Sequence, residues 1–206
     1  MNGVSSDQRR YELKARAVRQ RRTRQRIIAA TAALHREVGP ARTTIVDVAR
    51  RAGVQRLTVY NHFPVLQDLL GACQQHFLTR HPPPDLMSFA SGDKGGGLDA
   101  ALVALYSWYR AHRSIEHNVH RDRHLIPELD ELMRANADPQ FDAAASAHAE
   151  VLGTTPASVE AASCLIRVAL EFSTWELLAD RGMADADIAR LLWQAATCTA
   201  KEGVPS

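Results

Sequence analysis

Hydrophobic positions recur every three to four residues through most of the chain, a spacing that predicts helices. In the first 80 residues the pattern predicts four helices, over residues 23–38, 44–52, 55–63 and 65–80. Further helices are predicted over residues 98–113, 127–153, 156–181 and 185–201. Residues 82–97 are rich in Pro, Gly, Ser and Asp and predict a loop between two modules. No segment combines strict alternation of apolar and polar positions with β-branched residues, which would indicate a strand. We therefore expect an all-α fold of eight or nine helices.

A short pair of predicted helices meets at a glycine turn. The hydroxyl of Thr44 can cap the free amides of the helix over 44–52, and Asp47 holds the acidic position of a capping box. Gly53 can adopt the left-handed conformation that ends a helix. Two short helices joined in this way, in a basic context, are typical of a helix-turn-helix.

Charge is distributed unevenly along the 206 residues, whose net charge is only +2. Residues 1–63 hold 14 Lys and Arg against 4 Asp and Glu, a net charge of +10, whereas residues 64–206 hold 11 against 19, a net charge of −8. This asymmetry indicates either a polyanion partner for the first third or a solvated basic tail. Residues 1–22 are the most basic part and carry few large apolar side chains, so we expect a mobile arm or a fraying helix there.

The second helix of the pair, residues 55–63, offers hydrogen-bonding side chains between the positions expected to face inward, which are Val54, Val59 and Phe63. Arg can form a fork of hydrogen bonds to guanine, Gln or Asn can do so to adenine, and hydroxyl or imidazole groups suit phosphate oxygens. The alternative is an ordinary solvent-facing helix surface. We predict that double-stranded DNA is contacted by Arg24, Thr43, Thr44, Gln55, Arg56, Thr58, Tyr60, Asn61 and His62.

The stretch from about residue 21 to residue 81 resembles the N-terminal DNA-binding domain of the tetracycline-repressor (TetR) family. The matching segments are Thr43-Thr44, Asp47-Val48-Ala49, Ala52-Gly53-Val54, the run from Thr58 to Pro64, and Leu69-Leu70. The composition indicates a basic flexible arm over 1–20, and the resemblance implies a DNA-binding domain over 21–81 with its helix-turn-helix at about 44–63, followed by a larger helical domain over 82–206. It also implies that the C-terminal domain dimerises and binds a small-molecule effector, with no cofactor and no catalytic step.

Three positions depart from the family pattern. Leu57 stands where the family has a small residue, Gln55 where it has Ser, and Leu66 where it commonly has a phosphate-binding Lys. Leu57 can either narrow the approach to the DNA groove or contact a thymine methyl group. The basic residues before Thr23 can compensate for the missing Lys by following the DNA backbone or entering a minor groove.

The C-terminal part contains aromatic residues and histidines that are either core or ligand contacts. Candidate effector contacts are Trp108, Tyr109, His112, His117, His120, Phe172 and Trp175. His117, His120 and His124 share one face if that segment is helical, which raises the alternative of a metal-binding or hydrolytic protein that uses the 112–124 cluster. The neighbouring arginines repel a metal ion, and no HExxH or GxSxG motif occurs, so we expect no metal and no enzyme.

The last two predicted helices carry more apolar surface than a terminal helix pair needs for its own packing. A two-fold interface with a second copy or an ordinary internal core would cover it, and we favour the homodimer. Its residues are Leu165, Val168, Ala169, Phe172, Leu177, Leu178, Ile188, Leu191, Leu192 and Ala195.

Three scattered cysteines predict reduced thiols, and no apolar run has the about 18–20 residues that a membrane span needs. The basic start lacks the apolar stretch of a signal peptide, so we expect a cytoplasmic protein with no membrane partner. The sequence thus predicts a dimeric, effector-responsive repressor that binds a palindromic operator. The alternative from another class is a sensor or scaffold whose DNA module is degenerate because of Leu57 and Leu66.

Overall fold

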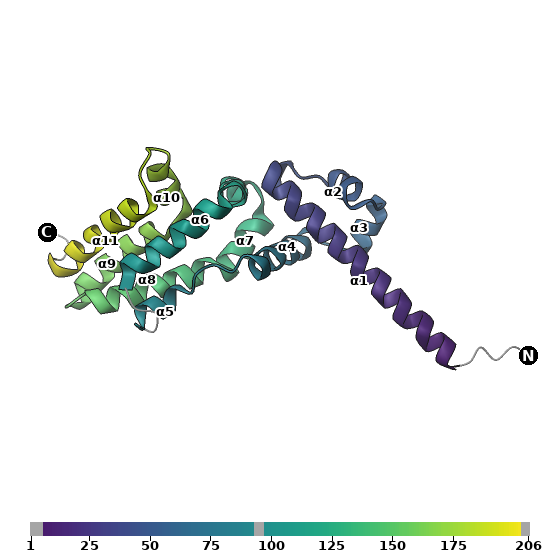
Figure 1. Cartoon of the computed structure of the whole chain (residues 1–206), viewed down its shortest axis with the longest axis horizontal. Coiled ribbons are helices and arrows are strands. Elements are labelled where there is room, and N and C mark those ends of the chain that lie inside the picture. Colours follow the sequence, from purple (N-terminus) through teal and green to yellow (C-terminus); the bar gives the residue numbers. More distant parts are fainter. Residues whose placement is uncertain (1–5, 93–96, 203–206) are drawn as a thin grey trace, which may run out of the picture. The chain divides into compact units, whose positions relative to one another are not determined.

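The computed structural model describes residues 6–92 and 97–202, and every regular element in these residues is helical (Figure 1). The all-α prediction is therefore confirmed for the described part of the chain. The chain divides into two compact units, Met1–Arg80 and His81–Ser206. The described residues of the two units contain eleven α-helices and two 3₁₀ turns, rather than the eight or nine helices expected from the sequence.

Unit 1, Met1–Arg80, is built from four α-helices in its described residues. They are α1 (Ser6–Glu37), α2 (Ile45–Ala52), α3 (Arg56–His62) and α4 (Leu66–Arg80), with a 3₁₀ turn at Pro40–Arg42. Helix α1 packs against α2 and α4, and α2 packs against α3. All four helices contribute to one buried core, made of Ile27, Ile28, Ala30, Val48, Ala49, Ala52, Val59, Phe63, Leu69, Ala72 and Cys73. The short helix α3 is therefore fixed by the same core that holds α1.

Helix α1 is much longer than the predicted helix over 23–38, because it begins at Ser6. Of the two forms expected for the basic N-terminal stretch, the structure has the helical one from Ser6 onward, and residues 1–5 lie outside the described residues. Arg, Lys, Gln, Glu and Ala all have good helix propensity, so a helix already fixed by the core extends through them at little cost. In Figure 1 this part of α1 continues past the other helices of unit 1.

Unit 2, His81–Ser206, is a larger helical bundle. Its elements are α5 (Leu86–Ala90), α6 (Gly97–Asp122), a 3₁₀ turn at Arg123–Leu125, α7 (Pro127–Asn136), α8 (Asp138–Leu152), α9 (Pro156–Leu170), α10 (Phe172–Ala179) and α11 (Asp185–Glu202). The strongest packing joins α9 to α8 and to α11, and α11 also packs on α6. The largest fully buried side chains of this core are Trp175, Tyr106, Tyr109 and Phe172.

Unit 2 corrects the predicted loop over 82–97. The structure places the short helix α5 there, and the side chain of Asp85 caps it by accepting a hydrogen bond from the Ser88 amide at 3.4 Å. Residues 93–96 of the same predicted loop lie outside the described residues. Helix α6 runs well beyond the predicted end at residue 113, with non-helical backbone angles at His112 that mark a kink.

Two long predicted helices are each divided in the structure. The helix expected over 127–153 breaks at Ala137, and Pro139 lies in the first turn of α8, where its missing amide hydrogen costs nothing. The helix expected over 156–181 breaks at Glu171. There the buried hydroxyls of Tyr106 and Tyr109 donate to the carbonyls of Ala169 and Leu170 at 2.8 and 2.7 Å, which satisfies acceptors that the end of α9 leaves open.

Candidate nucleic-acid interface

The turn between α2 and α3 has the local features that the sequence predicts. Thr44 is the N-cap of α2, and its hydroxyl accepts a hydrogen bond from the Asp47 amide at 3.1 Å. The Thr44 hydroxyl also donates to the Asp47 carboxylate at 2.5 Å, which holds the pKa of that carboxyl below its usual value. Helix α2 ends at Gly53 with φ at 62°, the left-handed conformation expected for this position. Helix α2 therefore begins and ends where capping chemistry requires.

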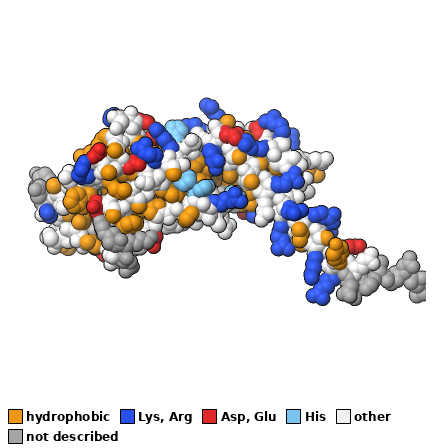
Figure 2. All heavy atoms as spheres, viewed as in Figure 1, with side chains coloured by type: hydrophobic (Ala, Val, Ile, Leu, Met, Phe, Trp, Pro, Cys, Tyr) orange, Lys and Arg blue, Asp and Glu red, His pale blue; other side chains and the backbone are white. Residues whose placement is uncertain are grey.

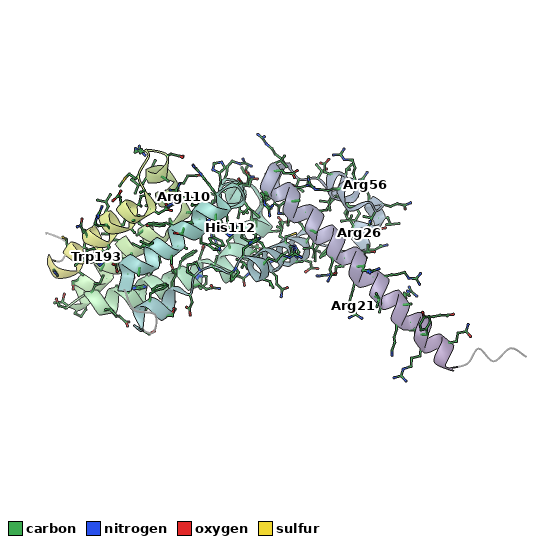
Figure 3. The ribbon with its side chains drawn as sticks, viewed as in Figure 1. Arg21, Arg26, Arg56, Arg110, His112 and Trp193 are labelled. Atoms are coloured by element: carbon green, nitrogen blue, oxygen red, sulfur yellow. The ribbon has the colours of Figure 1, made fainter. Side chains whose placement is uncertain are left out.

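Arg26 on α1 binds this turn directly, an interaction that the sequence pattern did not predict. Its Nε donates to the Ala52 carbonyl at 3.0 Å, and its Nη2 donates to the Gly53 carbonyl at 2.9 Å and to that of Ala52 (Figure 3). The last carbonyls of a helix carry a partial negative charge and lack partners within the helix. Arg26 supplies both the partner and the positive charge, and it thereby attaches the α2–α3 turn to α1.

A second cross-link joins the end of α1 to α2. Arg51 donates from both terminal nitrogens to the Glu37 carboxylate, at 2.5 and 2.7 Å. The guanidinium of Arg51 lowers the pKa of Glu37, and the carboxylate in turn raises the pKa of Arg51. Both side chains are exposed, so the pair adds little to the stability of the fold.

Helix α3 turns its apolar side inward and its polar side to solvent, as its sequence predicts. Val59 is fully buried, Phe63 is 3% exposed, and Val54 packs against the same core. Thr58 and His62 are half-buried. The remaining predicted DNA contacts on this helix are exposed: Gln55, Arg56, Tyr60 and Asn61. Arg56 is labelled on α3 in Figure 3.

The other predicted DNA contacts lie outside α3 and have partners within unit 1. The guanidinium of Arg24 lies 4.7 Å from the centre of the Phe63 ring, and the side chain is exposed. The hydroxyl of Thr43 donates to the Gly39 carbonyl at 2.8 Å, so Thr43 is occupied by the turn after α1. Thr44, as described above, caps α2.

Apolar side chains are also exposed on this helix-turn-helix. Leu57 is 66% exposed near the start of α3, and Val46 on α2 is 46% exposed. Leu66, the first residue of α4, is 42% exposed. The sequence pattern singles out Leu57 and Leu66 but gives no role to Val46. The polar flank of α3 is therefore interrupted by one large apolar side chain that is free to contact a partner.

The histidines of α6 do not come together as a metal site. The ring of His117 lies 3.0 Å from the Glu176 carboxylate, His120 stacks on Phe172 with ring centres 5.2 Å apart, and His124 falls in the 3₁₀ turn after α6 ends. No group of three or more potential metal ligands occurs in the part of the chain that the structure describes. The shared face expected for His117, His120 and His124 is broken because the α-helix stops at Asp122.

The aromatic residues predicted as effector contacts form one cluster inside unit 2. The ring of Tyr109 lies 5.2 Å from that of Phe172 and 5.8 Å from those of Trp175 and Trp108. Trp108 is half-buried, donates from its indole nitrogen to the His81 carbonyl at 3.2 Å, and contacts the His112 ring at 5.0 Å. The cluster brings together six of the seven candidate residues, whereas His117 lies on the exposed side, next to Glu176.

The apolar residues predicted for a dimer interface divide into three groups by burial. Ala169, Phe172 and Ile188 belong to the core of unit 2 itself and are at most 1% exposed, so the internal packing accounts for them. Leu165, Leu178, Leu192 and Ala195 are half-buried. Large apolar side chains of the third group remain exposed on α9, α10 and α11: Val168 at 51%, Leu177 at 56% and Leu191 at 46%.

Comparisons with known proteins agree with this architecture. Residues 27–73 match the sequence profile of the family described as "Bacterial regulatory proteins, tetR family". A tetR-family transcriptional regulator from Streptomyces coelicolor shares the fold with a TM-score of 0.60 and 21% sequence identity, over 86% of this chain and 79% of the other. No curated protein sequence gives a significant match. In the described residues, no helix is long and apolar enough to cross a membrane.

Proposed function

We propose that the chain acts as a homodimeric repressor that binds a palindromic operator. Its residues 27–73 match the tetR family of bacterial regulatory proteins, whose members are DNA-binding transcriptional regulators. The observation that carries the proposal is the geometry of α3. Val59 and Phe63 anchor the helix in the core, and the opposite flank of hydrogen-bonding side chains is exposed. A short helix of this kind fits the major groove of DNA, about 12 Å wide.

Each polar side chain on the exposed flank of α3 has a definite role in this proposal. Arg56 forms a fork of hydrogen bonds to guanine, and Gln55 and Asn61 do so to adenine. Tyr60, with Thr58 and His62 beside it, binds phosphate oxygens and fixes the register of the helix along the groove. The hydrogen bonds from Arg26 to Ala52 and Gly53 keep α3 in the orientation that these contacts require.

The second part of the proposal concerns regulation in the cytoplasm, where the operator lies. A small molecule that enters the aromatic cluster around Tyr109 and Phe172 would favour a conformation of the dimer in which the two α3 helices no longer match adjacent major grooves, about 34–36 Å apart. Effector and DNA would then compete through their preference for different conformations. In this proposal the Tyr109 hydroxyl, which donates to the last carbonyl of α9, couples the cluster to the break between α9 and α10.

The proposal is tested by selecting duplexes from a random DNA pool with the full chain and titrating the selected duplex by fluorescence anisotropy at a stated salt concentration. We expect Tyr60→Ala to lower affinity for every duplex by about tenfold, since it removes a phosphate contact. We expect Arg56→Ala to cost about 1–3 kcal/mol on the selected duplex and to relax base preference at one position.

Arg134→Ala is the matched control, because Arg134 is an exposed arginine of unit 2. It should leave both affinity and base preference unchanged. Failure of the full chain to enrich any duplex, or equal effects of Arg56→Ala and Arg134→Ala, would contradict DNA recognition by α3.

A further inference from the structure

The first part of α1 is a basic helix that has no part in the core of unit 1. We call residues Ser6–Arg22 the N-terminal extension; they precede the segment that matches the family profile, residues 27–73. Seven Lys and Arg stand in residues 1–22, against only Asp7 and Glu12. The first core residue of α1 is Ile27, which is fully buried. The extension therefore contributes nothing to the hydrophobic core of unit 1, and its basic residues need another explanation.

The basic side chains of the extension are available to a partner. Every described one is exposed: Arg10, Lys14, Arg16, Arg19, Arg21 and Arg22. Figure 2 shows Lys and Arg side chains gathered along this part of α1, and Arg21 is labelled on it in Figure 3. The ion pairs found in the described side chains of unit 1 join Arg50 to Asp47 and Arg51 to Glu37, and neither involves the extension.

The arrangement of these charges around the helix fits a polyanion better than a membrane surface. A helix that lies on a membrane separates an apolar face from a basic face. Here residues 10, 14 and 21 lie along one side of the helix, whereas residues 16 and 19 lie along another, at a period of 3.6 residues per turn. Among the exposed large hydrophobic side chains, Tyr11 and Val18 share a side of the helix with Arg22, whereas Leu13 lies on another side, so no apolar face free of basic residues is formed.

The length of the extension allows contact with DNA beyond the groove that α3 occupies. Seventeen residues of α-helix span about 25 Å at about 1.5 Å per residue. DNA carries one negative charge per about 1.7 Å of its axis, so a basic helix of this length can meet several phosphates at once. The same helix holds Arg26, which binds the α2–α3 turn, so the extension is continuous with the element that positions α3.

We propose that the N-terminal extension is a second DNA-binding element, which contacts the phosphate backbone beside the site read by α3 through its lysine and arginine side chains. This inference rests on the proposed function, because it assigns a further partner surface for the same DNA. The contacts are electrostatic and independent of base sequence. They strengthen binding to selected and unselected duplexes by the same factor and leave the preference between them unchanged.

The test compares the full chain with the variant Arg10→Gln/Lys14→Gln/Arg16→Gln/Arg19→Gln in anisotropy titrations at several salt concentrations. Gln keeps helix propensity close to that of Arg and Lys, so circular dichroism should stay unchanged. Removing one positive charge that neutralises a phosphate lowers the salt slope of log affinity by about 0.9, so removing four lowers it by up to about 3.6. We expect at least tenfold weaker binding near 0.1 M salt, on selected and unselected duplexes alike.

The matched control is Arg134→Gln/Arg181→Gln, which removes exposed positive charges from unit 2. Per charge removed, this control should change the DNA affinity and the salt slope of log affinity by close to zero. A chain that begins at residue 21 behind a start methionine provides a second test. Compared with the full chain, it should bind DNA more weakly and protect a shorter stretch of DNA in a footprint.

The outcomes separate this inference from the proposed function. If both extension variants bind the selected duplex with unchanged affinity and salt slope, the extension is inert, although recognition by α3 stands. If either binds DNA more tightly, the extension instead pairs with the acidic part of the chain, residues 64–206, and the inference is wrong. If the full chain enriches no duplex at all, the proposed function itself fails.

Discussion

At the scale of single residues, the helix-turn-helix depends on one arginine that patterns among neighbouring residues of the sequence could not identify. Thr44 and Gly53 could be predicted because a cap and a left-handed glycine act on their immediate neighbours. Arg26 could not, because its acceptors lie 26 and 27 positions away and only the crossing of α1 over the turn brings them together. In the sequence Arg26 is one of many basic residues near the N-terminus.

We expect Arg26→Ala to weaken both unit 1 and its binding to DNA. The change leaves the carbonyls of Ala52 and Gly53 without their charged partner, which costs about 1–2 kcal/mol of unfolding free energy at a partly exposed site. Urea unfolding followed by circular dichroism measures this loss. Gln25→Ala is the control, since Gln25 is an exposed neighbour on the same helix, and a similar loss there would show that Arg26 has no special role.

A buried histidine of α8 should make the stability of unit 2 depend on pH. His148 is 2% exposed and donates from Nε2 to the Leu86 carbonyl at 3.1 Å, and burial lowers the pKa of its ring below the ordinary value of 6.5. The unfolded chain therefore binds a proton at this residue more readily than the folded chain. The free energy of unfolding should fall as pH decreases below about 6.5 and continue to fall until the folded pKa is passed.

Urea unfolding between pH 7.5 and pH 5 measures this dependence. In His148→Gln the curve should be flatter over this range, whatever the absolute stability of the variant. His124→Gln, which changes an exposed histidine, should keep the slope of the natural chain. An unchanged slope in His148→Gln would assign the pH dependence to other groups.

At the scale of elements, the sequence predicts those helices whose ends are set locally. The ends of α2 and α3 follow from the Thr44 cap, Gly53 and the buried positions Val59 and Phe63. For the N-terminal extension the sequence leaves a mobile arm and a fraying helix open, because few apolar residues interrupt it. The structure has the helix, since a helix already fixed by the core at Ile27 continues through good helix formers without further burial.

Breaks within long helical patterns depend on tertiary contacts and escape prediction for that reason. The division between α9 and α10 at Glu171 is stabilised by hydroxyl groups of Tyr106 and Tyr109, more than 60 positions earlier in the chain. The periodicity of apolar residues continues across the break, so it predicts one helix. The same limit applies to the aromatic cluster: the sequence names its members, but only the fold shows that Tyr109, Phe172 and Trp175 contact one another.

At the scale of the whole molecule, the chain combines a basic first third with an acidic remainder. The net charge of +10 over residues 1–63 coincides with the exposed flank of α3 and with the N-terminal extension, both of which we assign to DNA. The net charge of −8 over residues 64–206 disfavours DNA contact by the rest of the chain. We expect the proposed palindromic operator to be recognised by two copies, which meet through the less basic part of the chain.

The exposed apolar side chains on α9, α10 and α11 are the surface through which we expect two copies to associate. A stable interface buries at least about 1,200 Å² in total, and a charge introduced near its centre would be buried without a partner. Val168→Glu combined with Leu191→Glu should therefore convert a dimer to a 22.7 kDa monomer in sedimentation velocity, with the dissociation constant raised at least about 100-fold. Leu125→Glu, at a residue that is 68% exposed outside these helices, should remain dimeric.

The same variants connect assembly with DNA binding. A monomer still carries one complete α3, so it should bind a single half-site as the natural chain does at concentrations too low for dimers. It should lose most of its affinity for the full palindrome. Binding of one copy at the first half-site no longer holds a second α3 near the other half-site at a high effective concentration. A natural chain that sediments as a monomer at micromolar concentration, or a Val168→Glu/Leu191→Glu variant with undiminished affinity for the palindrome, would remove α9–α11 as the basis of two-fold recognition.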